Sequence, residues 1–158
     1  MKIKTVSNRV SMANLTRSDW GDVDIDEDYS YAFDKFYGKS LAEAVDYLKG
    51  NSNDAFECVE NMNSVPFRVY FSHFVNFVRT EGIEHDDSYS MADAVFEISL
   101  RKLKNEPSKI LPIMEDVLSC LHFISEHQEE YDADEDIFGN FQKKYKVIHD
   151  LYMEGEGR

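Results

Sequence analysis

The amino-acid sequence predicts an all-α fold, a single-domain bundle of about five or six helices with an acidic N-terminal arm. Apolar residues recur at helical spacing along most of the chain from residue 29 onward. Glycine, proline and capping residues interrupt that pattern where helices are expected to begin and end. Strands do not alternate with helices in the pattern, and no repeat of about 20–50 residues is evident.

The composition fits one acidic, folded domain. The chain has 158 residues, of which 31 are Asp or Glu and 17 are Lys or Arg, so its formal net charge is −14. A hydrophobic share of 42% and an aromatic share of 13% suffice for a core and argue against a disordered chain. The negative charge disfavours direct binding to nucleic acid and to an anionic membrane surface.

Two further observations predict a soluble cytoplasmic protein. No stretch approaches the ~20 apolar residues of a membrane span, and the N-terminal residues show no apolar core of a signal peptide. The two cysteines, Cys58 and Cys120, do not make a disulfide framework. Both thiols are therefore expected to be free.

Charge is distributed unevenly along the first part of the chain. Residues 1–17 contain basic side chains and no acid, whereas 18–34 contain acidic side chains and no base. Neither helical nor strand periodicity holds across 1–28, so a loosely ordered arm is expected there, followed by a helical domain over 29–158. An alternative is that the basic segment folds back onto the protein's own acidic surface.

The helical pattern begins with a short aromatic helix over 29–37, which Gly38 ends. Ser40 and Glu43 then form the sequence signature of a capping box, in which each side chain satisfies the other residue's backbone N–H. The helix after this box is expected to end at Gly50, because glycine is favoured just after a helix.

A second short helix is expected over 53–62. The stretch 65–80 is the most apolar one, and its period fits a helix or a strand. Sixteen residues is long for a strand, and Pro66 and Gly82 suit the start and end of a helix. We therefore predict a helix there.

The rest of the chain predicts three more elements. A helix over 90–104 has its acid near the start and its bases near the end, as the helix dipole favours. The apolar seam over 110–130 predicts the longest helix of the protein. An acidic loop over 131–139 comes next, and Asn140 is expected to cap the last helix.

Two motifs resemble ligand-binding loops but fail on closer inspection. Gly38-Lys39-Ser40 ends like a phosphate-binding loop, but Phe33 stands where that motif needs a glycine. The acidic run that begins at Asp132 starts like a calcium loop, but Ile137 stands at its glycine position. A helix cap and a solvated acidic surface explain these residues better.

No catalytic, metal or cofactor site is predicted. His122, Glu126 and Glu130 share a helix face and offer metal ligands, but such spacing is more typical of a solvated stripe. The Glu-x-x-His and His-Glu-x-x-His signatures of metal sites in helices do not occur. His73 is expected to be an interior histidine. Cys58 has no adjacent basic residue to lower its pKa and Cys120 lies in an apolar run, so both are expected to be small buried residues and not nucleophiles.

A resemblance adds to this interpretation. The stretch 33–44 and the later segment 66–70 resemble small uncharacterised bacterial helical proteins. Some such families are regarded as immunity proteins that are encoded beside secreted toxins. The resemblance covers about a third of the chain, implies an all-α fold in a bacterial cytoplasm, and assigns no functional residue.

Charge therefore suggests an acidic binding protein that is not an enzyme. A toxin nuclease must be basic where it holds phosphates, so an inhibitor with fixed carboxylates competes for that surface. Aromatic neighbours are expected to anchor the contact, since interface hot spots favour Trp and Tyr. The alternatives are a regulator or adaptor without a toxin partner, and an enzyme with a site in the bundle. The sequence leaves the oligomeric state open. The predicted partner-binding residues are Trp20, Asp22, Asp24, Asp26, Glu27, Asp28, Tyr29, Tyr131, Asp132, Asp134, Glu135 and Asp136.

Overall fold

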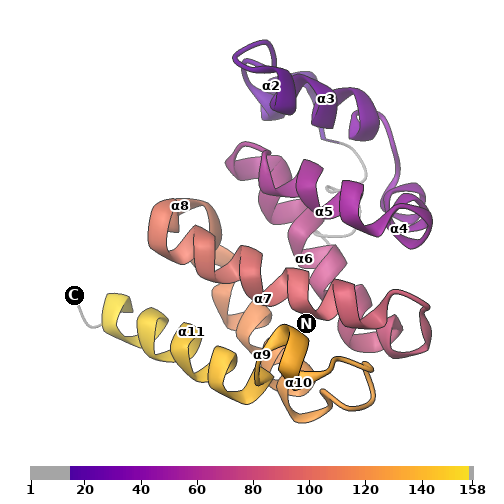
Figure 1. Ribbon diagram of the computed structural model, residues 1–158. Helices are drawn as coiled ribbons and strands as arrows, with labels where there is room; N and C mark the ends of the chain where they lie inside the picture. The colour runs from indigo at the N-terminus through magenta and orange to yellow at the C-terminus, as the bar shows by residue number, and fades with distance from the viewer. Residues whose placement is uncertain (1–14, 157–158) are drawn as a thin grey trace. The chain divides into compact units, whose positions relative to one another are not determined.

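The computed structural model describes residues 15–156, and all regular structure in that range is helical (Figure 1). The all-α class is thus confirmed, although the described range holds more helices than the five or six predicted. The first elements are α2 (Arg17–Trp20), α3 (Glu27–Phe36), α4 (Leu41–Gly50), α5 (Ser52–Glu60) and α6 (Ser64–Thr80). They are followed by η1 (Gly82–Glu84), α7 (Ser88–Asn105), α8 (Pro107–Ile110), η2 (Leu111–Ile113), α9 (Met114–Glu126), α10 (Glu135–Phe138) and α11 (Phe141–Glu156).

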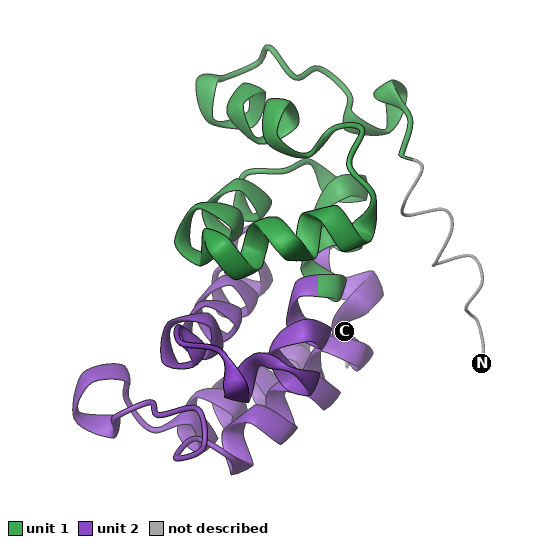
Figure 2. Ribbon diagram, turned by 90° about the vertical axis from the view of Figure 1, so that its right-hand side faces the viewer, with its two compact units in different colours: residues 1–73 green, residues 74–158 purple. Residues whose placement is uncertain are grey.

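The chain divides into two compact units, residues 1–73 and 74–158, where the sequence predicts a single domain (Figure 2). The boundary lies within α6, which is helical along its whole length. The helix that the ambiguous apolar stretch predicts is therefore confirmed. None of the described helices is both long and apolar enough to cross a membrane.

The end of the predicted loose arm is folded. Thr16 and Asp19 form a capping box at the start of α2, in which Asp19 Oδ2 accepts from the Thr16 N–H at 2.8 Å. Trp20 is wholly buried and Val23 nearly so. The prediction of a loosely ordered segment is thus wrong for residues 15–28, and residues 1–14 lie outside the described range.

Trp20 is the centre of the core of the first unit. Its indole ring lies 5.3 Å from the ring of Phe33 and 6.1 Å from those of Tyr29 and Tyr70, measured between centroids. Its carbonyl accepts hydrogen bonds from the Tyr29 hydroxyl and from Asn63 Nδ2, the latter at 3.1 Å. Trp20 and Tyr29 are therefore core residues, and the partner-anchoring role that the sequence suggests for them does not fit this fold.

Local caps set several helix ends as the sequence predicts. Ser40 Oγ accepts from the Glu43 N–H at 3.1 Å, and Glu43 Oε1 accepts from the Ser40 N–H at 2.8 Å, which completes the capping box of α4. These hydrogen bonds hold the pKa of Glu43 below its usual range. At the other end of the chain, Asn140 Oδ1 accepts from the Lys143 N–H at 2.9 Å and so caps α11.

The long helix predicted over 110–130 is broken, so that prediction is wrong. The chain passes through α8 and the 3₁₀ turn η2, and α9 extends only from Met114 to Glu126. Pro112 lies in η2. Proline has no backbone N–H to donate, and in a continuous α-helix its ring would clash with the preceding turn. The longest described helix is α7, with 18 residues.

In the second unit, α7, α9 and α11 pack around a shared apolar centre. The rings of Phe96 on α7 and Phe141 on α11 lie 4.8 Å apart between centroids. Ile148 on α11 and Leu121 on α9 are also buried. This packing brings α9 and α11 side by side, and the acidic loop over 131–139 joins them.

Replacing Trp20 with alanine should lower the free energy of unfolding by about 3–5 kcal/mol, because it empties a fully buried aromatic site. Ile25→Ala is the matched control, since Ile25 lies nearby in sequence but is 71% exposed, and it should change that energy by less than about 0.5 kcal/mol. Urea unfolding followed by circular dichroism measures both. Equal effects of the two substitutions would contradict the placement of Trp20.

Candidate partner-binding site

The loop between α9 and α11 is fastened to the second unit by Tyr131. This side chain is wholly buried, and its hydroxyl donates to the carbonyl of Val78 at 2.7 Å. The carbonyl of Tyr131 in turn accepts from Ser88 Oγ, also at 2.7 Å. Tyr131 is thus a core residue, and the sequence-based prediction that it anchors a partner directly is not compatible with its burial.

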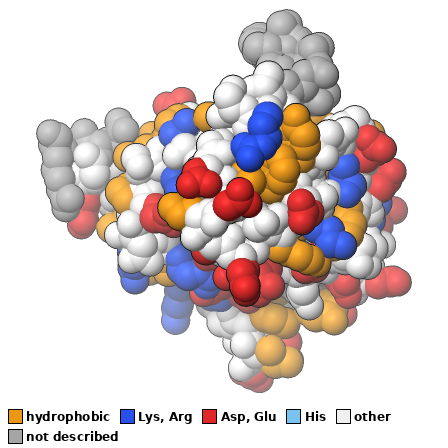
Figure 3. Space-filling model, turned by 90° about the horizontal axis from the view of Figure 1, so that it is seen from above, with side chains coloured by type: hydrophobic (Ala, Val, Ile, Leu, Met, Phe, Trp, Pro, Cys, Tyr) orange, Lys and Arg blue, Asp and Glu red, His pale blue; other side chains and the backbone are white. Residues whose placement is uncertain are grey.

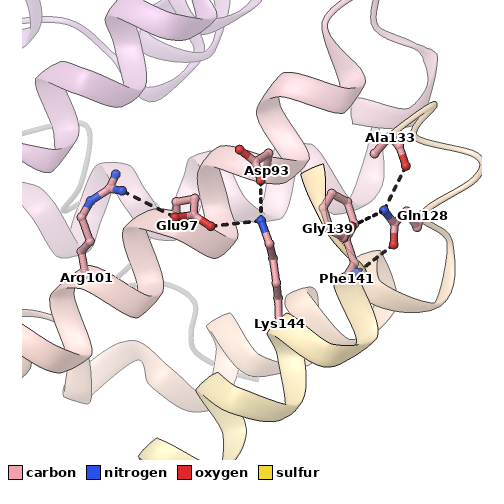
Figure 4. A network of polar contacts seen from close by, with 8 residues as sticks. All are labelled: Asp93, Glu97, Arg101, Gln128, Ala133, Gly139, Phe141 and Lys144. Carbon is pink, nitrogen blue, oxygen red and sulfur yellow. Dashed lines mark hydrogen bonds and ion pairs between the residues drawn. The ribbon is translucent and has the colours of Figure 1, made fainter. Parts of the chain in front are cut away.

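Gln128 ties the two ends of the loop together (Figure 4). Its Nε2 donates to the carbonyls of Ala133 and Gly139 at 2.9 and 2.8 Å. Its Oε1 accepts from the N–H of Phe141, the first residue of α11, at 2.7 Å. One amide side chain therefore satisfies three backbone groups that no regular structure pairs.

The acidic residues within the loop are held by a short helix. Asp134 caps α10, with its Oδ1 accepting from the Asp136 N–H at 2.8 Å. Asn140 Nδ2 donates to Glu135 Oε1 at 2.9 Å. Gly139 ends the helix at φ 80°, a left-handed conformation that glycine adopts without strain. The carboxylates of this segment are thus displayed from a folded turn.

These elements border an open acidic cavity of about 680 Å³. Its lining includes six carboxylates and three side-chain amides, and no lysine or arginine. We call it the acidic cavity. Its lining residues are Ser125, Glu126, Gln128, Glu129, Glu130, Ala133, Asp134, Glu135, Asp136, Asn140 and Gln142.

The sequence predicts part of this site and misses part of it. Of the residues that the sequence predicts to bind a partner, Asp134, Glu135 and Asp136 line this cavity. Asp132 is exposed but is not among the lining residues. The sequence does not predict that Glu129 and the amide side chains of Gln128, Asn140 and Gln142 line the cavity. A sequence signal for the surface exists, because the chain contains no lysine or arginine between Lys109 and Lys143.

The geometry does not favour a metal ion at this site. Within residues 15–156, no three His, Cys, Asp or Glu side chains converge as a metal site requires. His122 Nε2 lies 3.6 Å from Glu126, while Glu130 lies 3.8 Å from His127, so His122, Glu126 and Glu130 do not meet at one point. Carboxylates that are spread over a cavity instead suit several positive charges on one extended partner.

The other acidic segment, residues 22–28, lies in the first unit and has a different structure. Asp22, Asp24, Asp26, Glu27 and Asp28 are all exposed. Asp26 caps α3, with its Oδ1 accepting from the Tyr29 N–H at 2.8 Å. On the face drawn in Figure 3, acidic side chains are interspersed with basic and hydrophobic ones, so they form no continuous patch there.

A polar cluster in the first unit is a further arrangement that the sequence does not predict. Asp54 on α5 accepts from the hydroxyls of Tyr31, at 3.0 Å, and Tyr47. Burial and this neighbouring carboxylate raise the pKa of Tyr47 above its usual range. Lys35 Nζ lies 5.3 Å from the ring centroid of Tyr31. These groups satisfy one another, which is typical of a structural cluster.

Both cysteines are buried free thiols, as the sequence predicts. Burial, together with the charges of Asp54 and Glu57, raises the pKa of Cys58 to about 12. Burial also raises the pKa of Cys120. His73 is half-buried, with Nδ1 lying 3.3 Å from the carbonyl oxygen of Val69, and burial lowers its pKa. A reactive cysteine has a lowered thiol pKa, whereas the thiol pKa values of Cys58 and Cys120 are both raised.

The chain matches no known protein-family model, no curated protein and no solved structure. Its function must therefore be inferred from the arrangement of its own residues.

Replacing Gln128 with alanine should lower the free energy of unfolding by about 2–3 kcal/mol, because three backbone groups lose their partner. Gln142→Ala is the matched control, since Gln142 lines the same cavity but is exposed, and it should cost less than about 0.5 kcal/mol. Thermal and urea unfolding measure the difference. If the two variants are equally stable, Gln128 does not organise the loop.

The two thiols should resist modification in the folded protein. At pH 8, a soluble aromatic disulfide reagent should label neither cysteine within the time that it needs to label a free thiol, because both are buried and have raised pKa values. In denaturant, two thiols per chain should react, which absorbance of the released thiolate measures. Rapid labelling of either native cysteine would refute this assignment.

Proposed function

We propose that this protein is an acidic binding protein that neutralises a basic protein partner by covering the partner's functional surface. The acidic cavity is the observation that carries the proposal, because six carboxylates line it and no lysine or arginine does. A bacterial toxin, such as a nuclease, is the kind of partner that this chemistry fits, and the protein would then act as an immunity protein in the cytoplasm.

Charge gives the physical basis. A nuclease binds phosphates through lysine and arginine, so its active surface attracts carboxylates at the same places. An acidic inhibitor approaches such a surface faster than a neutral one, since opposite potentials steer the encounter. It also excludes the nucleic acid from the site that it covers.

The folded loop adds a second reason. The bonds of Gln128, and the cap and amide contacts of Asp134 and Glu135, hold the loop before any partner arrives. A preorganised surface loses less conformational freedom on binding than a loose acidic tail does. The cavity volume is also within the range of about 300–1,000 Å³ that is typical of ligand pockets, which leaves room for several inserted side chains.

A regulator or adaptor that binds a basic partner other than a toxin is the alternative. It uses the same surface and differs in its partner alone. The neighbouring gene distinguishes the two, because an immunity protein is expected beside the gene of a secreted toxin. We assign no catalytic activity to the acidic cavity.

The test compares two triple charge reversals that change the net charge equally. The first, Glu129→Lys/Glu130→Lys/Asp136→Lys, alters the cavity but spares the carboxylates of Asp134 and Glu135 that hold α10 in place. The second, Asp24→Lys/Glu27→Lys/Asp28→Lys, alters exposed acids of the first unit and spares the cap Asp26. Partners are captured from extracts of the native host on immobilised protein, and association is then measured by surface plasmon resonance.

The cavity reversal should slow association with the captured basic partner by about tenfold or more at low salt, and the control by less than about threefold. The difference should shrink as salt is raised, because the Debye length is only ~8 Å at 0.15 M. Equal effects of the two variants would mean that net charge alone matters. Capture of no basic protein would contradict the proposal itself.

A further inference from the structure

The outward face of α11 has charged side chains that pair with no other residue in the described part of the chain. Lys144 of this helix reaches across to α7, where its Nζ pairs with Asp93 and Glu97 at 2.8 and 3.0 Å (Figure 4). Lys146 pairs with Asp150, one turn further along, at 2.8 Å. Lys143 and Glu154 are exposed and form no ion pair with any other residue of the described range.

Lys143 and Glu154 each lie at the end of α11 where the helix dipole disfavours their charge. Lys143 is in the first turn and Glu154 in the last, whereas the helix dipole favours acids at the start and bases at the end. The neighbouring helices have the favourable order, since α9 begins with acids and α7 ends with lysines. The charge order of α11 is therefore not explained by the helix itself.

An exposed apolar side chain lies between the two charges. At about 100° per residue, Lys143, Val147 and Glu154 lie within about 40° of one another around the helix axis. Val147 is 53% exposed. Beside it is an apolar hollow of about 270 Å³, and a second of about 260 Å³ lies further along the helix. Phe96 and Ile148 line the first, and Leu111 and Leu151 the second.

We propose that this face of α11 binds the same face of a second copy of the chain, with the two helices antiparallel. In that arrangement, Lys143 of each copy meets Glu154 of the other, and the two Val147 side chains lie near the two-fold axis. Lys143 and Glu154 are eleven residues apart, or about 16 Å along a helix, so they cannot pair within one chain. Turning the helix end for end superposes each charge on its opposite.

Self-complementarity is what selects a second copy as the occupant. A two-fold interface uses the same patch on both subunits, so each contact occurs twice. The pattern of lysine, valine and glutamate along one helix face meets that condition. Asp150 lies on the same face, and its pair with Lys146 leaves it partly neutralised beside the partner's Val147.

The experiment measures the mass of the full chain in solution by sedimentation equilibrium over a range of concentrations. The wild type should associate from its monomer mass of 18.4 kDa to twice that mass. Lys143→Glu and Glu154→Lys should each raise the dimer dissociation constant at least about tenfold, because each replaces both ion pairs with repulsions. The double variant, Lys143→Glu/Glu154→Lys, should restore the dimer, because the reversed charges again face their opposites.

Folding does not obscure this test. Both reversals place the new charge where the helix dipole favours it, so neither should destabilise α11. Val147→Glu should also prevent association. Met153→Glu is its matched control, because Met153 is likewise 53% exposed but lies about 100° around the helix from the proposed face. Circular dichroism verifies that every variant retains its helical content.

Three results would overturn the proposal. The first is a wild type that stays monomeric at all concentrations, which would assign the face to another partner or to none. The second is a dimer that tolerates Lys143→Glu, Glu154→Lys and Val147→Glu. The third is a double variant that remains as monomeric as the single ones, since that would show that Lys143 and Glu154 do not pair with each other across the interface. Restored association in the double variant would support the antiparallel arrangement, because a parallel one places like charges opposite each other.

Discussion

The candidate site depends on the buried side chain of Tyr131 and its hydrogen bonds. Its hydroxyl reaches the carbonyl of Val78, and its own carbonyl receives the hydroxyl of Ser88. Both bonds join residues more than 40 positions apart in sequence, so they fix the middle of an acidic loop to the helices of the second unit. Without this attachment, the negative charges in the adjacent residues would favour an extended loop, because like charges repel.

Gln128 extends that attachment to both ends of the loop. Because its amide both donates and accepts, it joins the turn after α9, the end of α10 and the start of α11. The result is a high density of carboxylates on a backbone whose polar groups are largely satisfied. Such a preformed surface loses less conformational freedom on binding than a flexible acidic tail would.

Local signals in the sequence predict much of the secondary structure. The capping box at Ser40 and the cap at Asn140 are predictable because all their atoms lie within one helical turn. The break at Pro112 is not, because the apolar seam continues across it in the sequence. Acidic neighbours in sequence make Trp20, Tyr29 and Tyr131 resemble exposed anchors, whereas residues distant in the chain bury them. The contacts of Gln128 leave no local pattern. Charge alone nevertheless identifies three of the acids that line the cavity.

The most direct test of the acidic cavity as a preformed site is amide chemical-shift mapping with a lysine-rich peptide as the probe. We expect saturable shifts concentrated at residues 125–142, with the shifts of residues 22–28 much smaller at the same peptide concentration. Raising the salt concentration should weaken the binding without altering which residues respond. Shifts spread over both acidic segments in proportion to their charge would contradict a preformed site, because they would show that the carboxylates act only as a diffuse negative field.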